Sequence, residues 1–93
     1  MAVSVLIPTM LQNLSGGLDT VVVEATSVKT LVQALDEKHP GFGGRLRSAE
    51  GGLNRFINIY VNGEDIRFLD GAETPVKDGD EVSIVPAIAG GSH

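Results

Sequence analysis

One segment of this chain has the apolar spacing of a long amphipathic helix. A single helix of this kind must bury its apolar face against another layer of structure, such as one face of a β-sheet. The segment has apolar residues at i, i+3, i+4 and i+7, which are Val28, Leu31, Val32 and Leu35. Thr26 or Ser27 is a natural N-cap before it, and Pro40-Gly41 ends it near Lys38 or His39. The pattern predicts one main helix with one buried face.

The other apolar residues alternate with polar ones in short segments, which is typical of β-strands. These segments are residues 2–8, 20–24, 56–61 and 81–85. The first two pair as a hairpin, with the register left open because the loop between them is long. Asn62-Gly63 suits a tight type I′ turn, since both central residues need positive φ. A longer turn leading to a short strand at 66–68 is the alternative.

The element order is therefore β-β-α-β-β-β. One helix on one face of a mixed sheet of four or five strands is an α+β fold, and two hairpins around a helix describe the β-grasp. A ferredoxin-like fold needs a second substantial helix. The five glycines between Gly41 and Asn54 disfavour one and indicate a loop, with a short helical turn around residues 45–48.

The composition and charge of the chain exclude several classes of function. The chain has 93 residues, no cysteine and a net charge of −5, so we expect one domain, no thiolate chemistry and no nucleic-acid partner. The first eleven residues lack Lys and Arg, and no apolar run is long enough to span a bilayer, so we expect a cytoplasmic protein with no membrane partner.

An enzyme is the weakest interpretation. His39 and His93 are poor material for a metal site or a triad, and the glycine pairs form no phosphate cradle. Several carboxylates fall at expected turns, where Asp and Glu serve turn geometry; they are Glu64, Asp65, Asp78 and Asp80. We expect no catalytic residue and no metal site.

The C-terminus carries the most informative motif. After Pro86 the chain continues with small residues to Gly90-Gly91, so we divide it into a domain at 1–86 and a flexible tail at 87–93. Glycines have no Cβ, so such a tail can thread a narrow channel and place its end in a partner's active site. A glycine pair alone is weak evidence, because chain ends are often glycine-rich.

Three segments together point to a family. Residues 78–91 combine an Asp-Gly-Asp turn, an apolar strand, a proline and a Gly-Gly end, which resembles the C-terminal signature of the MoaD/ThiS sulfur carriers. Residues 55–68 and the opening 3–9 look like the CysO-type branch of that family, whose members supply sulfur for cysteine synthesis. The resemblance covers almost the whole chain and implies a ubiquitin-like β-grasp.

The resemblance also implies a chemistry. An E1-like adenylating enzyme of the MoeB/ThiF type would use ATP and magnesium to activate the Gly91 carboxylate, and sulfide or a persulfide would convert it to a thiocarboxylate. A sulfur-accepting synthase would then take the sulfur. In this interpretation Gly91 is the sulfur attachment point, Ala89 and Gly90 thread into the partner, and the chain itself binds no cofactor.

Ser92-His93 departs from the pattern, because carriers that act directly end at the second glycine. With these residues attached, the Gly91 carbonyl is an amide and cannot be adenylated. They are either a native extension, which a JAMM-type metalloprotease would remove, or additions foreign to the natural protein.

Alternation also predicts where a partner docks. If Val82 and Ile84 face the helix, their neighbours face the other side of the sheet. The expected docking residues are Phe56, Tyr60, Ser83, Val85 and the tail residue Ile88. The alternative for Phe56 is a strand-end residue that covers loop atoms.

Two other functions remain open at this point. The chain would act as a ubiquitin-like modifier if the activated glycine were joined to a protein lysine. It would be a non-catalytic β-grasp interaction domain if the tail were inert.

Overall fold

The structure is a computed structural model that describes residues 2–47, 52–54 and 56–86. The strands are β1 (Ala2–Leu6), β2 (Thr20–Glu24), β3 (Ile57–Val61), β4 (Glu64–Asp65) and β5 (Glu81–Pro86). The α-helices are α1 (Val28–Lys38) and α2 (Phe42–Leu46). Three short 3-10 helices are η1 (Thr9–Leu11), η2 (Ile66–Phe68) and η3 (Gly71–Glu73).

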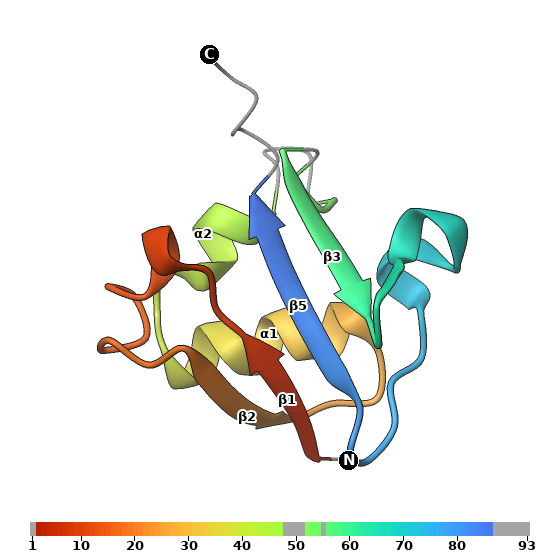
Figure 1. The fold of residues 1–93 in the computed structure, drawn as a ribbon, viewed down its shortest axis with the longest axis horizontal. Coiled ribbons are helices and arrows are strands. Elements are labelled where there is room, and N and C mark those ends of the chain that lie inside the picture. The colour runs from red at the N-terminus through yellow and green to blue at the C-terminus, as the bar shows by residue number, and fades with distance from the viewer. Residues whose placement is uncertain (1, 48–51, 55, 87–93) are drawn as a thin grey trace.

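The strands form one mixed five-stranded sheet in the order β2-β1-β5-β3-β4. β5 is the central strand; it runs parallel to β1 and antiparallel to β3. Both α-helices lie behind the sheet in the view of Figure 1, and the other face of the sheet is left open. The predicted β-grasp, with one main helix on a mixed sheet, is confirmed.

Strand alternation builds the core between α1 and the sheet. Val3 and Val5 of β1, Val82 of β5, and the predicted helix positions are fully or almost fully buried. Ser27, not Thr26, is the N-cap of α1. Its Oγ accepts from the Thr30 N–H at 3.2 Å, and its own N–H donates to Thr30 Oγ1 at 3.0 Å, so the two residues form a reciprocal capping box.

The glycine-rich segment after α1 forms a helix earlier than predicted. The expected turn at 45–48 is instead α2, Phe42–Leu46. Phe42 and Leu46 are fully buried beside α1, so this short helix extends the core. It forms despite two glycines because burial of these two side chains outweighs a weak helix propensity.

The hairpin after β3 follows the shorter of the two predicted forms. Asn62 and Gly63 have φ values of 51° and 89°, as a type I′ turn requires. β4 is therefore the dipeptide Glu64–Asp65, and the alternative strand at 66–68 is wrong. Those residues form η2, because the Asp65 carboxylate accepts from the Arg67 N–H at 2.9 Å and turns the chain.

Three strand ends also differ by small steps, and one of them is the start of β3, which lies at Ile57 rather than Phe56. β1 ends at Leu6 rather than Pro8, and Pro8 instead precedes η1. β5 includes Pro86, which pairs with Ile57 at the start of β3. The connection between β1 and β2 is not a featureless loop, since Leu11 and Ser15 are buried and the Ser15 hydroxyl donates to the Leu18 carbonyl at 2.6 Å.

Candidate functional site

The central strand β5 delivers the C-terminus. Its last residue, Pro86, lies opposite Ile57, so β5 ends beside the start of β3 (Figure 1). The predicted tail residues Ile88, Ala89, Gly90 and Gly91, together with Ser92-His93, lie outside the described residues. What the structure supplies is the surface from which that tail departs.

The predicted alternation of β5 is observed. Val82 and Ile84 are 0% and 3% exposed and face the helix, whereas Ser83 is half-buried and Val85 is 41% exposed on the open face. Ser83 lies directly opposite Tyr60 of β3, and Val85 lies opposite Asn58. Three of the predicted docking residues, Tyr60, Ser83 and Val85, therefore share one face of two neighbouring strands.

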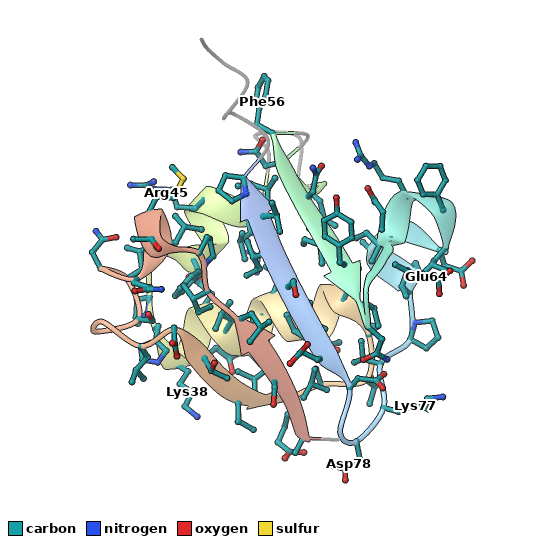
Figure 2. The ribbon with its side chains drawn as sticks, in the orientation of Figure 1. Lys38, Arg45, Phe56, Glu64, Lys77 and Asp78 are labelled. Carbon is teal, nitrogen blue, oxygen red and sulfur yellow. The ribbon has the colours of Figure 1, made fainter. Side chains whose placement is uncertain are left out.

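Phe56 lies at the same end of the molecule. It comes directly before β3 and is 54% exposed, and its N–H donates to Asn54 Oδ1 at 2.8 Å. Figure 2 shows Phe56 projecting at the end of the molecule where β5 terminates, far from Lys77 and Asp78. The fixed backbone therefore presents an aromatic ring beside the departure point of the tail.

One further residue belongs to this face and was missed from the sequence. Leu6 of β1 pairs with Ser83 of β5 in the parallel ladder, so it shares the face of Ser83 and Tyr60. The signal was present in the alternation of β1, but only the β1–β5 register shows which residue stands beside Ser83. Leu6, Tyr60, Ser83, Val85 and Phe56 are called the exit face below.

Charge divides the open side of the sheet into two parts. The residues of the exit face carry no ionisable group except the Tyr60 phenol, and the Asp65–Arg67 ion pair borders Tyr60 on the β4 side. At the other end of the strands lie Glu24 and Glu81, and the nearby Asp78 carboxylate accepts from the Ala2 N–H at 2.8 Å. A partner at the exit face therefore meets mainly apolar and small polar groups, the composition of an interface centre.

Among residues 2–47, 52–54 and 56–86, no group of three or more His, Cys, Asp or Glu residues is arranged to hold a metal ion. Within those same ranges, none of the helices has the length and apolar character needed to cross a membrane.

Comparison with known proteins identifies the family. The model of the ThiS family matches residues 5–91, so the match runs to Gly91. The sulfur carrier protein CysO of Mycobacterium tuberculosis is 43% identical over 93 residues, covering 98% of this chain and all of that protein.

Two further relatives bear on the site. CysO in the crystal structure of the Amycolatopsis orientalis BexX/CysO complex superposes with a TM-score of 0.90 at 46% identity, over 97% of this chain and 100% of that one. The small archaeal modifier protein 3 of Haloferax volcanii is 35% identical over 65 residues, or 70% of each chain. With the fold, the open face and a family match across almost its whole length, this chain belongs to the ThiS family.

Proposed function

We propose that this chain is a sulfur carrier that works through the carboxylate of Gly91. The observation that carries the proposal is the family match, which spans the domain and runs to Gly91. The 43% identity to a sulfur carrier protein over the full length of that relative supports the same role. A carrier is a substrate of its partner enzymes and not a catalyst.

The proposed chemistry proceeds in two steps. A carboxylate oxygen of Gly91 attacks the α-phosphorus of ATP on an E1-like enzyme of the MoeB/ThiF type, with magnesium, and pyrophosphate leaves. Sulfide then forms a C–S bond at the Gly91 carboxyl carbon while the C–O bond to AMP breaks. Where the donor is a persulfide, the product is an acyl disulfide, and a reducing thiol cleaves its S–S bond to leave the thiocarboxylate. Activation is needed because a carboxylate is a poor electrophile and the acyl-adenylate has a good leaving group.

The domain supplies reach and a docking surface. Five residues separate Pro86 from the end of Gly91, so an extended tail spans at most about 17 Å. The activating site must therefore lie within that distance of the exit face. We propose that residues 1–86 dock there while the tail from 87 enters the partner, with Ile88 extending the apolar contact and Ala89 and Gly90 fitting the narrow part.

Ser92 and His93 must be absent for this chemistry. When they follow Gly91, its carbonyl belongs to a peptide bond and offers no carboxylate oxygen to ATP. We propose that a JAMM-type metalloprotease exposes Gly91 wherever these two residues are native. We further propose that the carrier works in the cytoplasm, where ATP is available, and that its acceptor enzyme makes cysteine or another sulfur-containing metabolite.

The test compares two chains, one ending at Gly91 and one ending at His93. Each is incubated with the activating enzyme, ATP, magnesium and sulfide, and its intact mass is measured. The proposal expects one oxygen to be replaced by sulfur only in the chain ending at Gly91. If the chain ending at Gly91 keeps its mass under conditions that thiolate a known carrier, the tail is inert and the chain is an interaction domain.

A second function has one specific observation in its favour. The similarity to a small archaeal modifier protein allows the activated Gly91 to be joined to a protein lysine. The two roles share the activating step and differ in the acceptor. Protein adducts whose mass exceeds that of the target by one copy of the chain ending at Gly91, less one water, would mark the modifier role.

A further inference from the structure

A second exposed apolar surface lies away from the exit face. Phe68 of η2 is 85% exposed, and Leu69 next to it is 38% exposed. Together with Pro75 they line a shallow depression of about 480 Å³. Phe68, Leu69 and Pro75, with the charged residues around this depression, are called the Phe68 surface below.

The Phe68 side chain is held in the open by a rigid backbone. Ile66, at the start of η2, is 4% exposed and anchors the turn in the core. Asp65 accepts from the Arg67 N–H, and its carboxylate also binds the Arg67 guanidinium through both oxygens, with the shortest contact at 2.6 Å. A large aromatic ring presented in this way loses little conformational freedom on binding, as in the aromatic anchors of protein interfaces.

The segment that follows is also fixed. The Leu69 N–H donates to the Ile66 carbonyl at 2.9 Å, and the Asp70 N–H donates to Thr74 Oγ1 at 3.1 Å. Thr74 is 3% exposed, so this hydrogen bond ties the loop to the interior. The exposure of Phe68 is therefore built into the fold and does not come from a loosely attached loop.

The charges around the depression define its partner. Glu64, Asp70 and Asp80 line it together with a single lysine, Lys77. The Asp80 carboxylate accepts from the Asn62 side chain at 3.0 Å and from the Lys77 N–H at 2.8 Å, and these contacts lower its pKa. An apolar centre with an acidic rim fits an apolar side chain flanked by Lys or Arg.

The Phe68 surface and the exit face lie on different sides of the molecule. Figure 2 shows Glu64 beside η2 and η3 on the right, well away from Phe56 at the top. η2 and η3 border the β4 edge of the sheet, whereas the exit face is centred on β5. A carrier meets two kinds of enzyme with the same tail, one that loads the sulfur and one that takes it.

We propose that the Phe68 surface docks the sulfur-accepting enzyme, through an apolar side chain of that enzyme flanked by basic ones. The inference rests on the proposed carrier function. Loading uses the exit face, and unloading uses the Phe68 surface together with the tail. Separate surfaces let each partner recognise the carrier without the other's contacts.

The test measures, in the protein's own host, how the rate at which the carrier gains sulfur compares with the rate at which it gives sulfur up. The carrier is replaced by Phe68→Ser, and the fraction of its molecules that end in a thiocarboxylate is measured by intact mass. Loss of an aromatic anchor weakens docking by about tenfold or more. Because loading continues and unloading slows, the thiocarboxylate fraction should rise severalfold above that of the wild type.

A charge variant tests the acidic rim independently. Glu64→Lys combined with Asp70→Lys should raise the thiocarboxylate fraction in the same direction, because it repels a basic partner. The matched control is Leu18→Ser, since Leu18 is 51% exposed in the loop between η1 and β2, on the side of the molecule opposite η2 and η3 (Figure 1). The control should leave the fraction unchanged.

A thiocarboxylate fraction that falls in Phe68→Ser would overturn the inference, because the surface would then serve loading. An unchanged fraction would overturn it as well, and so would a concentration-dependent dimer of the wild type that Phe68→Ser abolishes, since a second copy would then be the occupant. If the wild type itself carries no thiocarboxylate, the proposed function fails, and this inference falls with it.

Discussion

The carboxylate of Asp36 accepts a hydrogen bond from the Gly43 N–H at 2.8 Å, and this contact fixes the start of α2 against the end of α1. The same Oδ1 atom accepts from the Gly41 N–H at 3.1 Å. Asp36 lies on the outward side of the predicted helix but is half-buried because α2 folds over it. Phe42 and Leu46 enter the core through this arrangement.

Substitution by alanine should destabilise the protein at Gly43 but not at Gly44. A Cβ at Gly43 would lie 2.9 Å from Cγ and Oδ2 of Asp36, whereas a Cβ at Gly44 meets no atom within 4 Å. We expect Gly43→Ala to lower the free energy of unfolding by about 1–3 kcal/mol. Gly44→Ala should leave it unchanged or raise it by up to about 1 kcal/mol, because alanine favours the helix. Urea titrations of both variants check this, and equal midpoints would contradict it.

Protonation of the Asp36 carboxylate should contribute to the unfolding of the protein in acid. Hydrogen bonds from the Gly43 and Gly41 amides lower the pKa of this carboxyl below its ordinary value of 3.8. A lowered pKa in the folded state means that the stabilisation is present above pH 3.8 and is lost as the pH falls through the folded-state value. Asp36→Asn should therefore flatten the loss of stability below about pH 4, measured by urea unfolding at several pH values. If the free energy of unfolding of Asp36→Asn falls as steeply in acid as that of the wild type, this contact is not linked to acid unfolding.

Asn62 should matter for its side chain as well as for its backbone. With φ at 51°, its Oδ1 accepts from the Glu81 N–H at 3.0 Å, and its Nδ2 donates to Asp80 at 3.0 Å. Asn62→Ala loses both bonds and strains the turn, so we expect a loss of about 1–2 kcal/mol. Asn62→Gly loses the bonds but accepts positive φ, so thermal unfolding should place it between alanine and the wild type. An Asn62→Gly variant with a lower melting temperature than Asn62→Ala would refute the assigned turn.

Val85 and Val22 provide a matched test of the exit face. Both are valines on the open side of the sheet, 41% and 50% exposed, but Val22 lies on the edge strand β2 and Val85 near the end of β5. Val85→Asp should slow thiocarboxylate formation by about tenfold or more, because it places a charge in a desolvated interface centre. Val22→Asp should leave the rate within about twofold of the wild type. Similar melting temperatures for both variants would confirm that folding is not the cause, and equal rates would remove the exit face from the loading step.

The sequence predicts those parts of the fold in which the residue pattern alone determines the local geometry. The α1 face, the alternation of β5 and the Asn62-Gly63 turn each follow from local geometry that a few residues determine. The covering of one sheet face by one helix then indicates an α+β fold class, whereas the strand order comes from the structure.

The remaining features depend on contacts between distant residues. The sequence predicts the second helical segment a few residues too late, at 45–48, because Gly43 and Gly44 are typical of a loop. Only the Asp36 contacts and the burial of Phe42 make residues 42–46 helical. β4 was displaced because two residues are too short to give an alternation. Leu6 was missed from the exit face because its neighbour Ser83 is set by the parallel β1–β5 register.

The roles of Gly90 and Gly91 are of a different kind. Periodicity and composition say only that the end of the chain is small and can be extended. The chemistry came from the resemblance to sulfur carriers, and the ThiS family match supports it.

The most direct test of the account is the intact mass of the untagged protein isolated from its own host. A carrier function predicts a species that ends at Gly91 and carries sulfur in place of one carboxylate oxygen. A single species of the full 93-residue mass, unchanged after incubation with activating enzyme, ATP and sulfide, would contradict it.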